Sequence, residues 1–162
     1  MGQKESRPTL RVVDVEWDHP DAILLRGEMD AELAPRYRDV EIGDGGQALS
    51  VDPHTVVVTY LVYEPDAGPP IGHAALRVGS VGLEVKRMFV RPGHRGRGVA
   101  GSLLSALEAA ARQRHEARVI LQTGERQPEA IGLYERAGYR RIPIFPPYEV
   151  VPLSICFEKR LG

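Results

Sequence analysis

The sequence contains a single cysteine, Cys156, among its 162 residues. One cysteine cannot form an internal disulfide, and such scarcity is typical of a reducing compartment, so we expect a cytoplasmic protein. Cys156 lies in the apolar segment 153–157, which predicts a buried strand, and we interpret it as a small core residue rather than a nucleophile. The five histidines are scattered without the spacing of metal ligands, so no metal site is expected.

Long apolar runs and a surplus of basic residues are also missing. No apolar run approaches the roughly 20 residues that a membrane-spanning helix requires, and the first residues lack the apolar stretch of a signal peptide. Lysine and arginine number 21 against 22 acidic residues, which gives a formal net charge of −1. Proteins that bind nucleic acid through phosphates usually carry a clear positive surplus. We therefore expect neither a membrane nor nucleic acid as a partner.

The remaining composition fits a single folded domain. Hydrophobic residues make up 43% of the chain and charged residues 27%, which is ordinary for a globular protein. No internal repeat or long linker divides the chain, so residues 1–162 are expected to form one domain, with residues 1–8 as a flexible tail.

Hydrophobic periodicity and turn residues predict the order β-α-β-β-β-α-β-α-β-β. The predicted strands are residues 10–13, 55–63, 71–78, 83–90, 119–121, 142–144 and 153–158. One predicted helix begins near His19, and two others span residues 98–115 and 128–136, while residues 43–46 predict a loop. This order indicates an α/β fold with a mixed sheet and three helices or more.

Residues 95–101, Arg-Gly-Arg-Gly-Val-Ala-Gly, lie between a predicted strand and a predicted helix. Alternating glycines allow the backbone to approach a ligand closely. The unpaired N–H groups and the positive dipole end of the following helix are directed at the same place, and two arginines add positive charge. The segment is therefore interpreted as a cradle for a phosphate or pyrophosphate.

Other interpretations of these glycines are weaker. Gly96, Gly98 and Gly101 match the dinucleotide fingerprint G-x-G-x-x-G, but residues 91–95 separate them from the strand, and only 61 residues follow Gly101. A P-loop is excluded because no Gly-Lys-Ser/Thr closes the turn. A purely structural helix start explains the glycines but not the arginines.

Two segments carry a family resemblance. Residues 86–100, Lys-Arg-Met-Phe-Val-Arg-Pro-Gly-His-Arg-Gly-Arg-Gly-Val-Ala, resemble the signature of the GNAT acetyltransferase superfamily, which is Arg/Gln-x-x-Gly-x-Gly/Ala after a strand. Residues 130–139, Ala-Ile-Gly-Leu-Tyr-Glu-Arg-Ala-Gly-Tyr, resemble a second element of that family. The resemblance implies a mixed, mostly antiparallel sheet of six to seven strands with splayed central strands, flanked by about four helices.

The resemblance implies acetyl-CoA as co-substrate and assigns the residues that bind it. The backbone of Met88, Phe89 and Val90 would pair with the pantetheine arm, although these residues also suit an ordinary core strand. The pyrophosphate would be bound, mainly through backbone N–H groups, by Arg95, Gly96, Arg97, Gly98, Val99 and Ala100. The side chains of the two arginines also suit solvated loop charges. Gln127 stands where members often carry an asparagine that contacts the cofactor.

The resemblance also implies two catalytic residues. Tyr134 matches the tyrosine that protonates the departing thiolate of CoA, and a phenol, with a pKa near 10, holds that proton at pH 7. A packed aromatic is the alternative. Glu84 matches a position where some members carry the base that deprotonates the amine. Because it lies six residues before Val90, strand alternation predicts that both share one face. An ion pair with Lys86 or Arg87 explains Glu84 equally well.

The implied reaction is direct transfer of an acetyl group from acetyl-CoA to a primary amine of a small molecule or peptide. No covalent acyl-enzyme is needed. Residues 32–37 and 145–148 are expected to select the acceptor, but neither segment identifies it. A non-catalytic acyl-CoA sensor and an O-acyltransferase remain alternatives, and a homodimer is left open.

Overall fold

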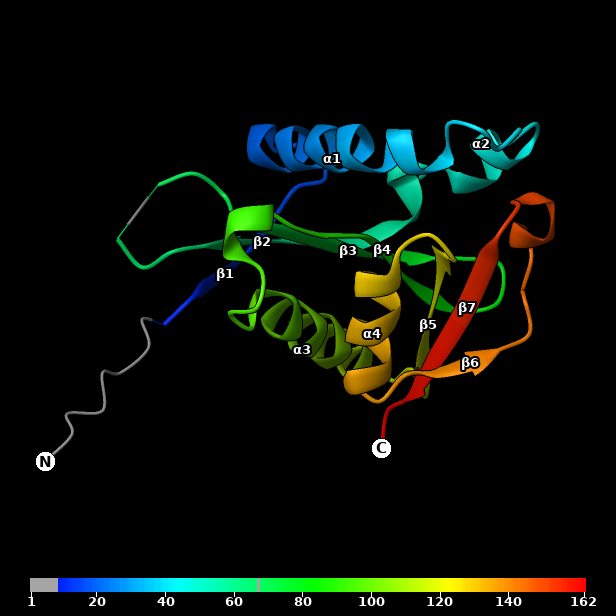
Figure 1. Cartoon of the computed structure of the whole chain (residues 1–162). Coiled ribbons are helices and arrows are strands. Elements are labelled where there is room, and N and C mark those ends of the chain that lie inside the picture. The colour runs from blue at the N-terminus through cyan, green and yellow to red at the C-terminus, as the bar shows by residue number, and fades with distance from the viewer. Residues whose placement is uncertain (1–8, 67) are drawn as a thin grey trace, which may run out of the picture.

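The computed structural model describes residues 9–66 and 68–162, which form an α/β fold around one seven-stranded sheet (Figure 1). The expected flexible tail, residues 1–8, lies outside the described residues. The strand order is β1-β2-β3-β4-β5-β7-β6. The strands are β1 (Arg11–Val15), β2 (Val56–Tyr63), β3 (Gly72–Val78), β4 (Leu83–Val90), β5 (Arg118–Gly124), β6 (Arg140–Ile142) and β7 (Ser154–Arg160).

The sheet opens between its two central strands. All neighbouring strands are antiparallel except β4 and β5, which run parallel. Only Glu84 of β4 and Ile120 of β5 are paired in register, whereas β5 and β7 pair along their whole length. Because β4 and β5 separate after this pair, their carboxyl ends leave a gap in the sheet. This confirms the expected splayed strands.

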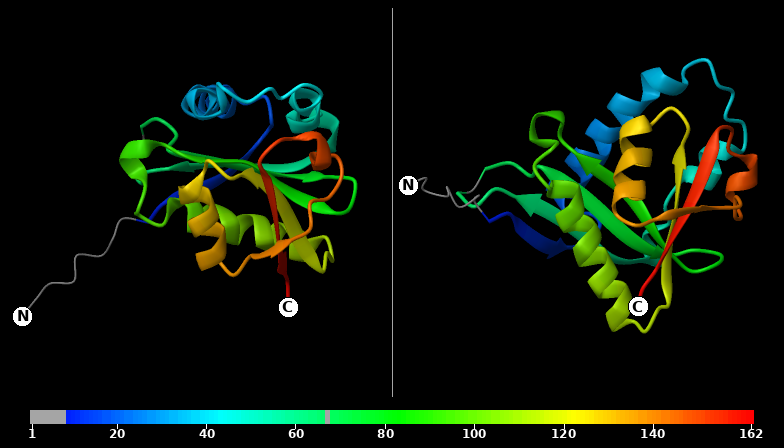
Figure 2. Two further views of the ribbon diagram at one scale, coloured as in Figure 1. Left: turned by 45° about the vertical axis from the view of Figure 1, so that its right-hand side comes forward. Right: turned by 60° about the horizontal axis from the view of Figure 1, so that its bottom comes forward.

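Helices cover both faces of the sheet (Figures 1 and 2). One face carries α1 (Pro20–Leu33) and the short α2 (Gly45–Leu49), and the other carries α3 (Val99–Gln113) and α4 (Pro128–Arg136). Four 3₁₀ turns complete the described chain: η1 (Ala34–Tyr37), η2 (Pro53–Thr55), η3 (Pro92–His94) and η4 (Tyr148–Val150). None of the helices in the described parts of the chain is long and apolar enough to cross a membrane.

Local sequence explains where the main helices begin and which face they bury. The His19 ring nitrogen accepts the Asp21 N–H at 3.1 Å, and Pro20 occupies the first turn, where its missing N–H costs nothing. On α3, Leu103, Leu104 and Leu107 are fully buried against the sheet, as the helical spacing predicts. The largest core cluster therefore lies between the sheet and α3.

Two segments differ from the predictions. Residues 43–46 were expected to be a loop, but α2 begins at Gly45, where an added Cβ atom would come within 2.7 Å of the Ile42 side chain and 3.2 Å of the Val150 carbonyl oxygen. This close approach joins segments more than 100 residues apart, so the local sequence could not show it. Strand β6 is Arg140–Ile142 rather than 142–144, because Gly138 ends α4 with a positive φ of 90° and the chain turns into β6 at once.

The expectation that Glu84 and Val90 share one face is wrong, because β4 contains a bulge. Phe89 pairs with His73 and Lys86 pairs with Ala75. The paired positions are therefore three residues apart on β4 but only two residues apart on β3. Arg87, in the bulge, has a positive φ of 57°. Across the bulge, Glu84 and Lys86 therefore share a face with Phe89, which packs against α1, whereas Val90 packs against α3.

Candidate active site

Two adjoining cavities follow the gap between β4 and β5. The first, of about 590 Å³, extends from the gap toward α1, α2 and the end of η4. The second, of about 500 Å³, lies at the glycine turn that precedes α3. The cavities share five lining residues: Met29, Leu33, Met88, Gln127 and Ala130. They therefore form one cleft that passes through the opened sheet.

The glycine turn forms one wall of the second cavity. Gly96 and Gly98 have positive φ angles of 77° and 82°, which L side chains rarely adopt. A Cβ atom added at either position would meet no other atom within 4 Å, so open space lies in front of the turn. Gly98 is also the N-cap of α3, whose free N–H groups and positive dipole end lie at this wall. The turn can therefore bind an anion, as the sequence predicted.

The cleft brings together most of the residues expected to bind the cofactor. The second cavity is lined by Met88, Phe89, Val90, Arg95, Gly96, Gly98, Val99, Ala100 and Gln127. Arg97 lines neither cavity and is exposed. This exposure matches the alternative that its side chain is a solvated charge.

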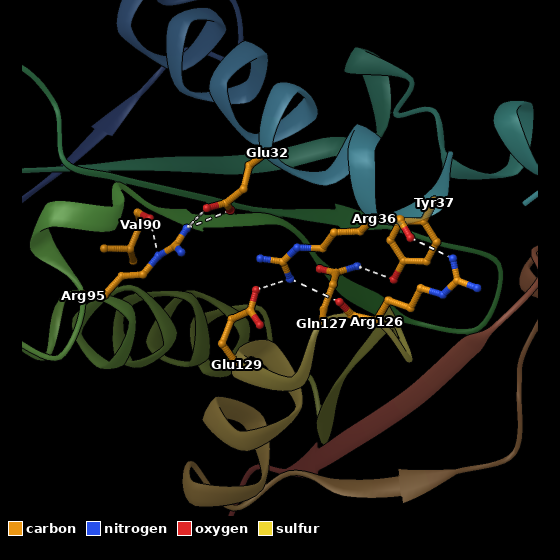
Figure 3. Close-up of polar contacts among 8 residues, drawn as sticks. All are labelled: Glu32, Arg36, Tyr37, Val90, Arg95, Arg126, Gln127 and Glu129. Atoms are coloured by element: carbon orange, nitrogen blue, oxygen red, sulfur yellow. Dashed lines mark hydrogen bonds and ion pairs between the residues drawn. The ribbon is translucent and has the colours of Figure 1, made fainter. Parts of the chain in front are cut away.

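The side chain of Arg95 is held in place by three contacts. Its Nε donates to the carbonyl of Val90 at 2.9 Å, and its guanidinium lies 5.8 Å from the centre of the Phe89 ring. One terminal nitrogen binds both carboxylate oxygens of Glu32 at 2.8 Å (Figure 3). Both residues of this ion pair line the second cavity, Glu32 from α1 and Arg95 from the turn before α3.

Further contacts connect the end of α1 and η1 to the start of α4 (Figure 3). Arg36 forms an ion pair with Glu129, and Arg126 donates to the carbonyl of Arg36 at 2.9 Å. The amide of Gln127 donates to the hydroxyl of Tyr37 at 3.2 Å. Together with the Arg95–Glu32 pair, these contacts form a polar bridge over the cleft. Residues 32–37 and 145–148 were expected to select the acceptor. Leu33, Ala34 and Tyr37 line the first cavity, whereas residues 145–148 line neither cavity.

Tyr134 lies on α4 and lines the first cavity. Only 5% of its surface is exposed, and its ring packs against Tyr139 and Phe157. Burial raises the pKa of its hydroxyl above the usual 10, because the charged phenolate is disfavoured away from water. Among the described residues, its hydroxyl has no hydrogen-bond partner within reach. Tyr134 therefore brings a fully protonated hydroxyl to the cavity.

Glu84 is fully buried and lines neither cavity. Its Oε2 accepts the hydroxyl of Tyr148 at 2.6 Å and lies 3.5 Å from the guanidinium of Arg77. The nearest cavity-lining member of this group is Lys86, whose Nζ donates to the Tyr148 hydroxyl at 2.9 Å. The contacts place Glu84 in an ionic network behind the cavity wall. Its role as a base stays a prediction.

The sequence suggested an ion pair of Glu84 with Lys86 or Arg87, but its ion-pair partner is Arg77, and the rest of the network was missed. Alternation along β4 puts Glu84 and Lys86 on one face, which is a usable signal. Arg77 also pairs directly with Glu84 across β3 and β4. Tyr148, however, comes from a 3₁₀ turn 64 residues away, and no local pattern connects it to β4. Cys156 is buried at 1% exposure, which confirms its interpretation as a core residue.

The sequence also matches a known protein family. The model of the acetyltransferase (GNAT) family matches residues 16–139, which is most of the chain. The chain belongs to this family. The match contains the glycine turn and Tyr134, so the two segments that suggested the resemblance both lie inside it.

Related proteins support the same assignment. An IAA acetyltransferase from Azospirillum brasilense is 37% identical over 97 residues, which are 59% of this chain and 63% of that protein. The match thus spans less than two thirds of that relative. A Klebsiella pneumoniae protein of known structure, assigned as an acyl-CoA N-acyltransferase, is 33% identical with a TM-score of 0.77 and covers 94% of this chain and 98% of its own.

A GNAT family acetyltransferase from Elizabethkingia anophelis, solved with acetyl-CoA bound, has the same fold. Its TM-score is 0.64 at 16% identity, over 94% of this chain and 98% of its own. Identity this low supports the architecture of the splayed sheet and not the details of the cleft.

Proposed function

We propose that this protein is an N-acetyltransferase that moves an acetyl group from acetyl-CoA directly to a primary amine of a small molecule. The observation that carries the proposal is the continuity of the cleft. It joins the glycine turn, which suits a pyrophosphate, to the Tyr134 hydroxyl, which suits proton donation. Membership of the acetyltransferase (GNAT) family supports the same reaction.

The residues of the second cavity fit acetyl-CoA. Gly96 and Gly98 leave open space at the N-terminus of α3, which suits a pyrophosphate. Because β4 has lost its pairing with β5 beyond Glu84, backbone groups at Met88 and Phe89 are available to the pantetheine arm. Gln127 and Ala130 of the opposite wall would enclose that arm where the two cavities meet.

When bound, acetyl-CoA supplies the thioester from which the acetyl group is transferred. Tyr134 would hold a proton at its hydroxyl and donate it to the departing sulfur, and the raised pKa of the hydroxyl keeps that proton in place at neutral pH. The splayed walls orient the two reactants, which lowers the entropic cost of reaction. The amine must arrive unprotonated, and base action by Glu84 would have to pass through Tyr148 or water.

The acceptor would enter through the first cavity. Its walls carry apolar side chains from α1 and α2 together with a few polar groups, as is usual for small-molecule sites. The following side chains supply the apolar part: Met29, Leu33, Val40, Ile42, Leu49 and Val151. An amine with an apolar body fits these walls best.

Cofactor binding is tested with Gly98→Val. A β-branched residue at a φ of 82° distorts the turn and fills the space in front of it. We expect acetyl-CoA to raise the Tm of the wild type and to lose this effect in the variant, while NADH shifts neither. Gly93→Val is the matched control, because Gly93 lies in the same loop, is exposed and lines neither cavity. Equal acetyl-CoA shifts in all three proteins would contradict the assigned cradle.

Catalysis is tested with a panel of amines incubated with acetyl-CoA, with release of free thiol as the readout. The proposal expects thiol release that requires both the protein and a particular amine, together with an N-acetylated product by mass spectrometry. Acetyl-CoA binding without amine-dependent release would instead indicate a sensor. A product acetylated only on oxygen would indicate an O-acyltransferase.

A further inference from the structure

Lys86 is a buried cation without an acidic partner. Only 6% of its surface is exposed, yet it lines the first cavity. An ammonium group has three N–H donors, and the described residues supply one acceptor, the hydroxyl of Tyr148 at 2.9 Å. Among the described residues, no carboxylate lies within 4.0 Å of its Nζ, whereas buried charges are usually paired.

The charges around Lys86 do not balance. The Tyr148 hydroxyl accepts from Arg77 at 2.8 Å and from Lys86, and it donates to Glu84, so its bonding capacity is filled. Glu84 is the only acid of this cluster, and it lies 3.5 Å from Arg77. Two cations therefore share one carboxylate, and Lys86 is the member that borders the cavity.

The other charged residues of the first cavity do not supply the missing anion. Arg87 and Asp30 both line the cavity, but they form an ion pair with each other at 2.7 Å. Arg87 also donates to the carbonyl of Arg26 at 2.9 Å. The single unpaired charge on the cavity wall is thus positive among the described residues, and the rest of the wall carries apolar and uncharged polar side chains.

We propose that Lys86 binds a carboxylate of the acceptor, so that the acceptor is an apolar amine that also carries an acid group. The amine group of the acceptor rests on the proposed function, whereas its acid group is inferred from the cavity alone. A single ammonium group that already has one hydrogen bond suits a singly charged carboxylate, whereas a phosphate group usually requires several donors. Phosphate therefore serves as the comparison ligand in the test.

The charge on Lys86 makes this binding depend on pH. Burial lowers the pKa of its ammonium group from 10.5 to about 8, so the group is mostly charged at pH 7 and loses its charge above pH 8. Carboxylate binding should therefore weaken as pH rises through about 8, and a bound anion should move that midpoint upward. The titratable or charged groups that face Lys86 are Arg77 of β3, Glu84 and Arg87 of β4, Tyr148 of η4 and Cys156 of β7.

The kinetic test uses acceptor amines that carry either a carboxylate or the corresponding amide. Phenylalanine is compared with phenylalaninamide, and leucine with leucinamide. Lys86→Met removes the charge and keeps the length of the side chain. We expect the variant to lower the acid-to-amide ratio of kcat/KM by about tenfold or more, mainly through the KM of the acid, as loss of a charge-assisted hydrogen bond implies. Dividing the ratio of the variant by that of the wild type cancels the different intrinsic reactivities of the amines.

Two further variants separate the local charge from other effects. Lys159→Met removes the same charge outside the cavity, where Lys159 pairs with Glu108 at 2.8 Å, and it should leave the ratio unchanged. Lys86→Arg keeps a cation and should restore part of the acid preference. A loss of kcat in Lys86→Met that is equal for acids and amides would indicate a role as base and would overturn the proposal.

A binding test needs no acetyl transfer. Calorimetry with 3-phenylpropionate, 3-phenylpropionamide and inorganic phosphate measures the anion site directly, after thermal unfolding has shown that each variant is folded. We expect the acid to bind the wild type more tightly than Lys86→Met, and more weakly at pH 9 than at pH 7. If this holds while no amine is acetylated, the proposed function fails and the carboxylate site stands. Equal affinity of both proteins for the acid, or a preference for phosphate, overturns the carboxylate site.

Discussion

Tyr134 is positioned by packing and not by a hydrogen bond. Its ring lies 5.6 Å from that of Tyr139 and 6.0 Å from that of Phe157, and its hydroxyl reaches the first cavity without a partner among the described residues. Hydroxyl groups in such a position are normally satisfied by a ligand or by water. The arrangement therefore suits a group whose partner is present only during the reaction.

Tyr134→Phe tests this role, because it keeps the ring and removes only the hydroxyl. If the hydroxyl donates a proton to the departing sulfur, kcat should fall by roughly tenfold to a hundredfold while acetyl-CoA affinity stays near that of the wild type. Steady-state rates and calorimetry measure the two quantities. Tyr139→Phe is the control, since its hydroxyl donates to Glu108 at 3.1 Å and it lines neither cavity. Equal kcat values in both variants would reduce Tyr134 to a packing residue.

At the residue scale, the sequence located the cleft better than it explained individual side chains. Gly96, Gly98 and Tyr134 were predictable because each lies in a short segment with a recognisable pattern. Lys86 was noticed only as a neighbour of Glu84, because its importance depends on what is missing around it. The absence of an acid within reach is a property of the packed structure that no local sequence pattern contains.

At the element scale, the bulge in β4 limited the prediction. Period-2 alternation holds from Leu83 to Lys86 and then changes phase at Arg87, so the side-chain direction predicted for Val90 was inverted. The bulge also directs the carbonyl of Arg87 to the ring of His73 at 2.9 Å. The run of strand-forming residues gave no sign of an extra residue at this point.

One contact of the polar bridge, the ion pair of Glu32 with Arg95, should oppose cofactor binding. Glu32 holds Arg95 and places a carboxylate on the wall of the cavity that would receive a pyrophosphate. Both side chains are partly exposed, so the pair itself adds little stability. Like charges in the same cavity repel, and Glu32 should therefore weaken the binding of acetyl-CoA.

Glu32→Gln should tighten acetyl-CoA binding by about three- to tenfold at low salt, as expected for removal of one charge several ångströms from the phosphates. The gain should shrink as salt screens the repulsion. Calorimetry at two ionic strengths measures both effects. Glu28→Gln is the matched control, because Glu28 lies one turn earlier on α1 and pairs with Arg91 at 2.6 Å without lining the cavity. Weaker binding in Glu32→Gln alone would show that Glu32 serves to position Arg95.

At the scale of the whole molecule, the sequence predicted the order of strands and helices, because periodicity records which residues are buried. It could not predict how α1 and η1 meet α4, because those contacts connect residues about 90 positions apart, such as Arg36 and Glu129 or Tyr37 and Gln127. They depend on how the sheet twists and where it opens. The acceptor half of the cleft is built from such contacts and was therefore the part left unidentified.

One buried histidine connects α1 to the sheet. His73 of β3 is fully buried, accepts from Arg26 of α1 at 3.0 Å through Nε2, and donates from Nδ1 to the carbonyl of Arg87 in the bulge. Both ring nitrogens are satisfied in the neutral form. Burial away from water is the main penalty on the protonated ring, and the nearby guanidinium groups of Arg26 and Arg87 add to it. The pKa of His73 is accordingly lowered from 6.5 to about 4.

This shift predicts how stability depends on pH. Between pH 6.5 and about 4 the unfolded chain binds a proton at His73 that the folded protein does not, so the free energy of unfolding falls as pH falls through this window. The full loss is about 3 kcal/mol for one such group. His73→Gln keeps an acceptor and donors but does not titrate, so the variant should lose stability less steeply on acidification. Denaturant unfolding from pH 7 to pH 4 measures the slopes, with His54→Gln at an exposed site as the control. Parallel curves for the wild type and His73→Gln would mean that protonation of His73 does not oppose the folded state.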